Sequence, residues 1–317
     1  MRKLLLAFLF SLMAALPAAA QSNKAGPVKA IASFSILADI VRQVGGPHVA
    51  VTTLVPAGGD GHVYQPSPAD ARAVAHADIL VSNGLNFETW LDRLVQASGF
   101  KGTRIVASEG ITPRRLEDDD DDHTHDHKSD AGHDHGHDHG AVDPHVWHDL
   151  QRMRRYVANI ADGLAKADPA HAGEYRQRAA AYSAELAALD IWAKAAFDAI
   201  PQSQRKAITQ HDAFGYLADR YKITFMAPQG MSTEAQASAE GVAKLIRQIK
   251  QEQVQALFFE NIINPRLIEQ IAKEAKVKLG GRLYSDSLGE PGSEADSFVK
   301  LFRLNVERLT GAMRRDS

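Results

Sequence analysis

Cysteine is absent from the 317-residue sequence. This absence excludes a disulfide framework, a thiolate metal site, a cysteine nucleophile and a cysteine-linked lipid anchor. After residue 20, no apolar run is long enough to cross a bilayer. The formal net charge of −3 gives no general attraction to nucleic acid or to anionic membranes. The composition is otherwise ordinary for a globular protein, with 44% hydrophobic and 24% charged residues, and the chain is long enough for two domains.

The first twenty residues have the order of features of an export signal. Arg2 and Lys3 make a basic start, residues 4–16 form an apolar run too short for a membrane-spanning helix, and Pro17 and three alanines follow. We predict a signal peptide at 1–20, cleaved near Ala20, rather than a buried N-terminal helix. The mature chain of about 297 residues (317 minus 20) is then exported and, lacking a cysteine for lipidation, free in the periplasm.

An acidic insert at 117–140 interrupts the sequence. It has ten acidic residues and one lysine, a net charge of −9, whereas the rest of the mature chain carries +4. No large apolar residue follows Leu116 within it, so we predict that the insert is disordered. It holds seven of the fourteen histidines: His123, His125, His127, His133, His135, His137 and His139. Our hypothesis is an auxiliary metal-collecting loop, and the alternative is an ordinary solvated acidic loop.

Outside the insert, strand and helix patterns alternate along the chain. Apolar and β-branched runs in the first half predict strands at 28–33, 49–55, 79–82 and 104–107, with helices at 36–44, 67–77 and 88–97. The second half predicts strands at 207–209, 223–226, 256–259 and 283–284, with helices at 212–221, 239–251, 265–275 and 294–313. Such alternation is typical of parallel sheets. The predicted fold class is therefore α/β, with two similar lobes and mainly parallel sheets.

A long helix is predicted between the two halves. After a helix at 152–166, Asp168-Pro169 starts a second one that meets no breaker before about residue 199, a length of about 45 Å. We interpret it as a rigid strut, and the alternative is two helices with a kink. The predicted organisation is an N-terminal lobe at 21–150, a helical linker at 151–200 and a C-terminal lobe at 201–317.

Four candidate metal ligands follow predicted strands or lie in loops: His62, His145, His211 and Asp286. Ligands bind outside the carboxyl ends of strands in open parallel sheets, and two of these residues come from each lobe. They could therefore meet in a cleft between the lobes. Three imidazoles and one carboxylate suit zinc. Taken singly, each residue also has an ordinary interpretation, such as a solvated loop histidine, a helix cap or an Asx turn.

Six stretches, in their order and spacing, carry a family resemblance: residues 59–70; Asn83-Gly84-Leu85 with Glu88 and Trp90; residues 143–147; residues 211–216; Phe259-Glu260 with Pro265; and Asp286-Ser287-Leu288. Over about residues 29–313 the sequence resembles the zinc/manganese-type solute-binding proteins of ABC transporters. The resemblance implies two α/β lobes joined by one long rigid helix, with the metal in the cleft between the lobes. It also implies that His62, His145, His211 and Asp286 are, in that order, the four ligands.

The resemblance further implies which metal and which partners to expect. Zinc-type members have histidine at the third ligand position, as His211 is here, where manganese-type members tend to have glutamate. We therefore expect Zn²⁺ rather than Mn²⁺, in agreement with the preference of manganese for oxygen ligands. The expected protein is a monomeric zinc receptor without enzymatic activity. It would deliver the metal to an inner-membrane ABC permease, and a periplasmic metal-donating protein is a further candidate partner.

Several residues depart from the family pattern or have an open role. Gly61 stands where proline is frequent, which would loosen the loop before His62, and residues 231–236 lack the proline usual before a glutamate. His148 is expected to be a surface histidine, with an alternative role as a ligand. Glu260 is either an outer hydrogen-bond acceptor for a ligating imidazole or an ordinary helix-start or loop carboxylate.

Two other functions remain open from the sequence. A zinc buffer or chaperone without a permease would need the same ligands. A zinc hydrolase would need three histidines and an open position on the metal, with Glu260 as the base, if Asp286 were not a ligand. No sequence motif places a general base beside the metal, which disfavours the hydrolase.

Overall fold

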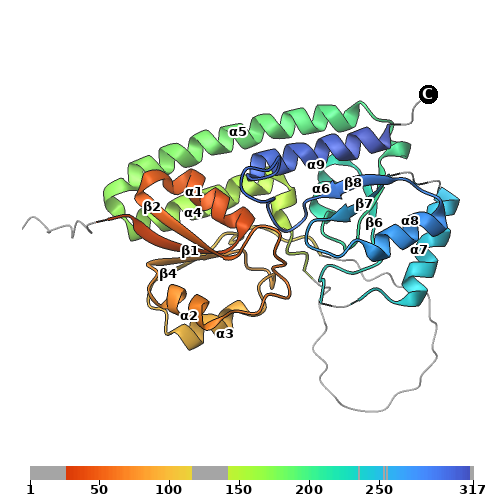
Figure 1. Ribbon diagram of the computed structural model, residues 1–317. Coiled ribbons are helices and arrows are strands. Elements are labelled where there is room, and N and C mark those ends of the chain that lie inside the picture. The colour runs from red at the N-terminus through yellow and green to blue at the C-terminus, as the bar shows by residue number, and fades with distance from the viewer. Residues whose placement is uncertain (1–25, 116–141, 235, 253, 255, 315–317) are drawn as a thin grey trace, which may run out of the picture.

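The computed structural model describes residues 26–115, 142–234, 236–252, 254 and 256–314. The predicted signal peptide and the insert at 117–140 lie outside these residues. The described chain forms two α/β lobes with parallel sheets, joined by a long helix (Figure 1). The predicted fold class is therefore confirmed. Among the described residues, no helix combines the length and the apolar character needed to cross a membrane.

The N-terminal lobe is built on a four-stranded parallel sheet with the order β2-β1-β3-β4. Its strands are β1 (Val28–Phe34), β2 (Val49–Val55), β3 (Ile79–Ser82) and β4 (Thr103–Val106). Its helices are α1 (Ser35–Gly45), α2 (Pro68–Ala75) and α3 (Leu91–Ser98). Helix α2 begins as predicted, because the Ser67 hydroxyl accepts from the Asp70 backbone N–H and Pro68 occupies the first helical position.

The C-terminal lobe has a four-stranded parallel sheet with the equivalent strand order, β6-β5-β7-β8. Its strands are β5 (Lys206–Ile208), β6 (Thr224–Met226), β7 (Ala256–Glu260) and β8 (Leu279–Leu283). Its helices are α6 (Gly215–Tyr221), α7 (Ala239–Glu252), α8 (Arg266–Ala275) and α9 (Phe298–Met313). Ile208, Leu257 and Ile268 belong to a separate core between this sheet and helices α7 and α8.

The connection between the lobes is helical except at Asp168. Helix α4 (Leu150–Ala167) leads through a 3₁₀ turn (Pro169–His171) into α5 (Ala172–Asp198), which has 27 residues and a length of about 40 Å. Helix α5 extends across both lobes, and α9 lies beside its C-terminal part, over the C-terminal lobe (Figure 1). The main hydrophobic core joins Ile36 of α1, Leu186 of α5 and Phe298 of α9. The two lobes therefore share one core along the strut.

The sequence patterns misplaced some element ends. Strand β8 begins at Leu279, whereas the sequence predicted a start at 283. The prediction was late because Gly280 and Gly281 interrupt the apolar pattern of the strand. A Cβ at Gly280 would lie only 2.5 Å from the Phe258 ring, so the absence of a side chain allows this strand to pack. The helix predicted from 88 begins at Leu91, since Glu88 is a buried carboxylate that accepts from the Ser33 hydroxyl and the Asn83 N–H.

A carboxylate on the strut holds α6 in place. Arg220 donates through Nε to Asp190 Oδ1 at 2.7 Å and also contacts Oδ2 through Nη2, and the Tyr221 hydroxyl donates to Asp190 Oδ1 at 2.8 Å. Burial alone would raise the pKa of Asp190, but these bonds outweigh it and lower that pKa below its ordinary value. Asp190 therefore stabilises the folded state as an anion.

We expect Asp190→Asn to lower the free energy of unfolding by about 1–3 kcal/mol at neutral pH, because it weakens bonds to a charged group. The contribution is complete above the pKa of the unfolded chain, about 4, and is lost as the pH falls through the lower folded pKa. Urea denaturation at neutral and acidic pH measures both effects. Asp198→Asn, which removes an exposed partner of Lys194 on the same helix, is the control. An equal loss of unfolding free energy in both variants would contradict this role. So would a stability difference between Asp190→Asn and the unaltered protein that persists in strong acid.

Candidate metal centre

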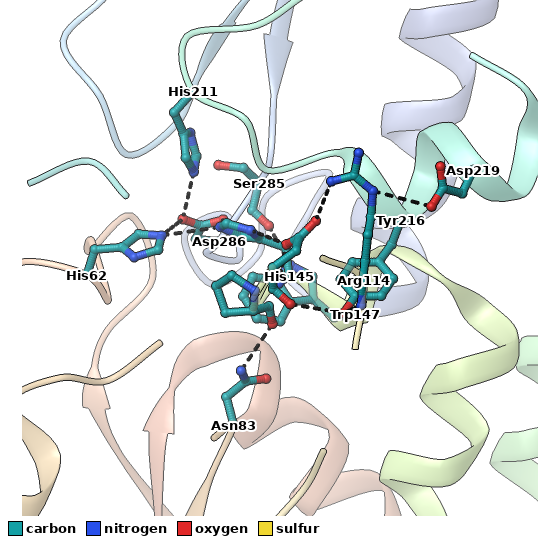
Figure 2. A network of polar contacts seen from close by, with 12 residues as sticks. His62, Asn83, Arg114, His145, Trp147, His211, Tyr216, Asp219, Ser285 and Asp286 are labelled. Atoms are coloured by element: carbon teal, nitrogen blue, oxygen red, sulfur yellow. Dashed lines mark hydrogen bonds and ion pairs between the residues drawn. The ribbon is translucent and has the colours of Figure 1, made fainter. Parts of the chain in front are cut away.

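The side chains of His62, His145, His211 and Asp286 come together between the lobes, with one ligand atom from each lying within 4.8 Å of the others. Asp286 Oδ2 lies 3.2 Å from His62 Nε2 and 3.3 Å from His211 Nε2. Asp286 Oδ1 lies 3.7 Å from His145 Nε2, and the Nε2 atoms of His62 and His145 are 3.2 Å apart. All three rings thus turn Nε2 toward one carboxylate (Figure 2).

The ends of the parallel strands position these residues. His62 lies in the loop after β2, His211 follows β5 and Asp286 follows β8, while His145 immediately precedes a 3₁₀ turn (Val146–His148). The segments that carry His145 and Asp286 are joined between lobes, because Trp147 Nε1 donates to the Ser285 carbonyl at 2.8 Å. Segments distant in sequence are therefore held together at the sheet edges.

Gly61 fits its position and does not loosen the loop before His62, contrary to the expectation from the sequence. Its carbonyl accepts a hydrogen bond from Trp90 Nε1 at 2.8 Å. A Cβ at Gly61 would lie 2.6 Å from the Phe87 ring, so the loop needs glycine to pack closely on this aromatic side chain. The backbone N–H of His62 is also held, because it donates to Asp60 Oδ1 at 2.9 Å.

The four residues are buried, with exposed fractions of 8% for His62, 0% for His145 and His211, and 1% for Asp286. Within the described part of the chain, His211 Nε2 and both carboxylate oxygens of Asp286 have no hydrogen-bond partner. Buried polar atoms without partners are unfavourable. A divalent cation bound by three imidazole nitrogens and one carboxylate would satisfy them, so the residues fit a metal ion.

Two of the rings are oriented by carboxylates on their outer side. Asp143 Oδ1 accepts from both the backbone N–H and Nδ1 of His145, each at 2.9 Å. Glu260 Oε2 lies 2.7 Å from His211 Nδ1, while Glu260 Oε1 accepts from the backbone N–H groups of Gln210 and His211. An acceptor at Nδ1 keeps the proton there and leaves Nε2 free to bind metal. Glu260 Oε2 and His211 Nδ1 are within ion-pair distance, but neither atom has a hydrogen-bond partner among the described residues, so the outer-acceptor role of Glu260 stays a prediction.

The charges of the site favour a cation at its centre. Burial alone would raise the pKa of Asp286, but the His211 and His145 rings hold it well below its ordinary value. Burial alone would lower the pKa of His211, but Glu260 and Asp286 raise it well above its ordinary value. Burial also opposes ionisation of Asp143, yet its bonds to His145 and the nearby Arg114 lower its pKa. The carboxylates are therefore anions that stabilise positive charge.

His148 is not the surface histidine expected from the sequence. It is 1% exposed and packs against Phe214, with ring centroids 4.6 Å apart. Burial and the neighbouring His145 lower its pKa to about 3, so it is a neutral ring. It does not belong to the group of four that share one centre.

Asp143 has no role among the predictions from the sequence, although it begins the family-like stretch at 143–147. The signal was its spacing, two residues before His145, which lets one carboxylate oxygen reach both the backbone and the ring of that histidine.

The family model described as zinc-uptake complex component A, periplasmic, matches residues 31–312. The chain belongs to this family. The match extends over both lobes, the strut and all four residues of the candidate metal centre.

Relatives of this zinc-uptake family member match nearly its whole length. The manganese ABC transporter substrate-binding lipoprotein PsaA of Streptococcus pneumoniae is 28% identical over 98% of this chain and 97% of the relative. The manganese-binding lipoprotein MntA of Bacillus subtilis (strain 168) is 30% identical over 89% of each chain. The solved structure of the periplasmic zinc binding protein TroA from Treponema pallidum has a TM-score of 0.82 and 26% identity, over 92% of this chain and 100% of its own.

Family membership assigns the general role. Members are solute-binding proteins and not enzymes. The protein is therefore an exported metal-binding receptor of an ABC importer, and such receptors work with an inner-membrane permease and its ATPase. The prediction that it is not an enzyme is confirmed, and the hydrolase alternative is wrong.

We expect Glu260→Gln to weaken metal binding by about 10- to 100-fold. If the amide nitrogen faces His211 Nδ1, the ring proton moves to Nε2 and blocks ligation. If the amide oxygen faces the ring, the amide nitrogen points at two backbone N–H groups. A zinc titration against a competing chelator measures the change.

Glu252→Gln is the matched control, because Glu252 is a surface partner of Lys206 at the end of α7. Equal affinities of the Glu260→Gln variant and the unaltered protein would contradict the role of Glu260, provided that circular dichroism finds both folded.

Proposed function

We propose that this receptor carries zinc, bound by His62, His145, His211 and Asp286, and delivers it to its permease. The observation that carries the proposal is the convergence of three buried Nε2 atoms on one buried carboxylate. Zinc in proteins takes four nitrogen, sulfur or oxygen ligands in a tetrahedron. This donor set supplies four such ligands without any thiolate.

Zinc is favoured over manganese by the identity of the third ligand. Manganese prefers carboxylate, carbonyl and water oxygens, whereas imidazole suits zinc. Here three of the four side chains are imidazoles, because His211 stands where the resemblance implies glutamate in manganese-type members. Both relatives described above and several others are named for manganese, whereas the Treponema pallidum protein is named for zinc, so the names alone do not assign zinc.

No covalent step is needed for this function. Asp143 and Glu260 orient the rings, the buried centre removes water from the metal, and release at the permease completes the cycle. The core shared by α1, α5 and α9 supports a modest structural change on metal binding rather than a wide hinge motion. The relatives are named lipoproteins, whereas the 317 residues include no cysteine for a lipid, which supports free periplasmic release after signal cleavage.

We expect His211→Ala to weaken zinc binding by more than about 100-fold, because loss of an outer partner alone costs about 10- to 100-fold. His211→Glu should narrow the difference between zinc and manganese affinities, since it replaces a nitrogen donor with an oxygen donor. Competition titrations with both metals measure the two effects. A tight zinc site indifferent to His211, or manganese bound more tightly than zinc by the unaltered protein, would refute the zinc assignment.

We propose in addition that the histidines of the insert at 117–140 collect zinc weakly. Imidazoles alternating with carboxylates bind divalent metals in several registers. Deletion of residues 118–139 should leave the tight site and remove the weak zinc equivalents. Equilibrium dialysis at excess zinc measures the stoichiometry. An unchanged number of bound zinc ions after the deletion would refute the collecting role.

A further inference from the structure

Asp143, the outer carboxylate of His145, pairs with an arginine, whereas Glu260, the carboxylate beside His211, has no lysine or arginine partner among the described residues. Asp143 uses Oδ1 for His145, and its second oxygen, Oδ2, lies 3.3 Å from Arg114 Nη1. Glu260 uses its second oxygen for backbone N–H groups instead. Asp143 is fully buried, and Arg114 is 25% exposed. The guanidinium of Arg114 is therefore linked to the ligand ring of His145 by one carboxylate, that of Asp143.

Arg114 is shared between that carboxylate and a surface carboxylate of the other lobe. Its Nε lies 3.3 Å from Asp219 Oδ2 on α6, and Asp219 is 65% exposed (Figure 2). Helix α6 begins with Gly215, where a Cβ would lie 2.5 Å from Arg114 Nη1 and 2.7 Å from Asp143 Oδ2. The start of the helix is therefore adapted to the ion pair, which packs directly against it.

The backbone around Asp143 is fixed independently of the guanidinium. The Tyr216 hydroxyl accepts from the Arg114 N–H at 2.8 Å and donates to the Asp143 carbonyl at 2.9 Å. The Asp143 N–H donates to the Arg114 carbonyl at 2.9 Å. With two bonds from His145 to its Oδ1 as well, Asp143 keeps its position when only the side chain of Arg114 changes.

The charges around the rings balance only when Arg114 is counted. Asp143, Glu260 and Asp286 are the buried carboxylates that contact the ligand rings. In the metal-bound state, in which the imidazoles are neutral, these three anions and the Arg114 cation have a net charge of −2, equal and opposite to a divalent metal. Asp219 is left out of this count because it is 65% exposed and solvent screens its charge. Without Arg114 the net charge is −3, and a dication is held more strongly.

We propose that Arg114 is a positioning residue that weakens metal binding, and so permits release, by drawing the charge of Asp143 away from His145. The proposal rests on the proposed function, because it requires metal at the four ligands. A strongly paired Asp143 makes His145 a poorer donor, and a free Asp143 makes it a better one. A merely structural role of Arg114 predicts the opposite sign, since its loss would then weaken binding.

The test is a zinc competition titration and a stopped-flow measurement of zinc release to a chelator, on the full mature chain. Arg114→Met should bind zinc about three- to tenfold more tightly, mainly through slower release. Arg114→Lys, which keeps the charge, should stay near the unaltered protein. Asp219→Asn should bind about twofold more weakly, because Arg114 then pairs with Asp143 alone. Arg104→Met, which removes an exposed cation that pairs with Asp92 in the same lobe, is the control.

Equal or weaker zinc binding by a folded Arg114→Met protein would overturn the proposal, and so would equal tightening in Arg104→Met. If Arg114→Met does not fold, the zinc affinity of Asp219→Asn tests the proposal instead. Unchanged or tighter zinc binding by that variant would overturn the proposal, because weaker binding is expected. Absence of a tight zinc site in the unaltered protein would instead refute the proposed function, and that result does not depend on any substitution at Arg114.

Discussion

Asp286 is a carboxylate buried among three imidazole nitrogens. The rest of the site is arranged to place positive charge beside this buried anion. A buried anion without compensation is strongly unfavourable. The sheet ends bring His62, His145 and His211 to it, and the remaining polar atoms of the centre point to the same position. The surrounding imidazoles compensate this anion, as its lowered pKa indicates, and a divalent metal would satisfy the polar atoms that have no hydrogen-bond partner among the described residues, which is the property that a metal receptor requires.

The scaffold keeps these donors together across two lobes. Around the segment that follows Asp286, the Leu288 N–H donates to the Ser35 hydroxyl at 3.0 Å and the Phe298 N–H at the start of α9 donates to Asp39 Oδ2 at 2.8 Å. Both acceptors belong to α1 of the other lobe. Together with the shared core along α5, these bonds make the position of Asp286 depend on the N-terminal lobe. Pre-organisation of this kind lowers the cost of ordering ligands around the metal.

Local patterns were sufficient for most of the fold, and the family resemblance gave the four residues of the centre. The β-branched run at 49–55 gave β2 with both ends correct, and the helix predicted from residue 67 begins one residue later, at Pro68. The glycines of β8 obscured its pattern, and burial of His148 could not be read from its polar side chain. The Arg114–Tyr216 contact joins residues 102 positions apart. No local pattern encodes such a contact, because it exists only when both lobes have folded.

The most direct test of the central claim is a crystal structure of the zinc-loaded protein, with anomalous scattering measured at the zinc edge. A strong peak is expected in the buried centre, about 2.0–2.2 Å from Nε2 of all three histidines and from an Asp286 oxygen. A strong peak elsewhere among the described residues with none in the centre, or a central zinc that lacks one of these four ligands, would contradict it.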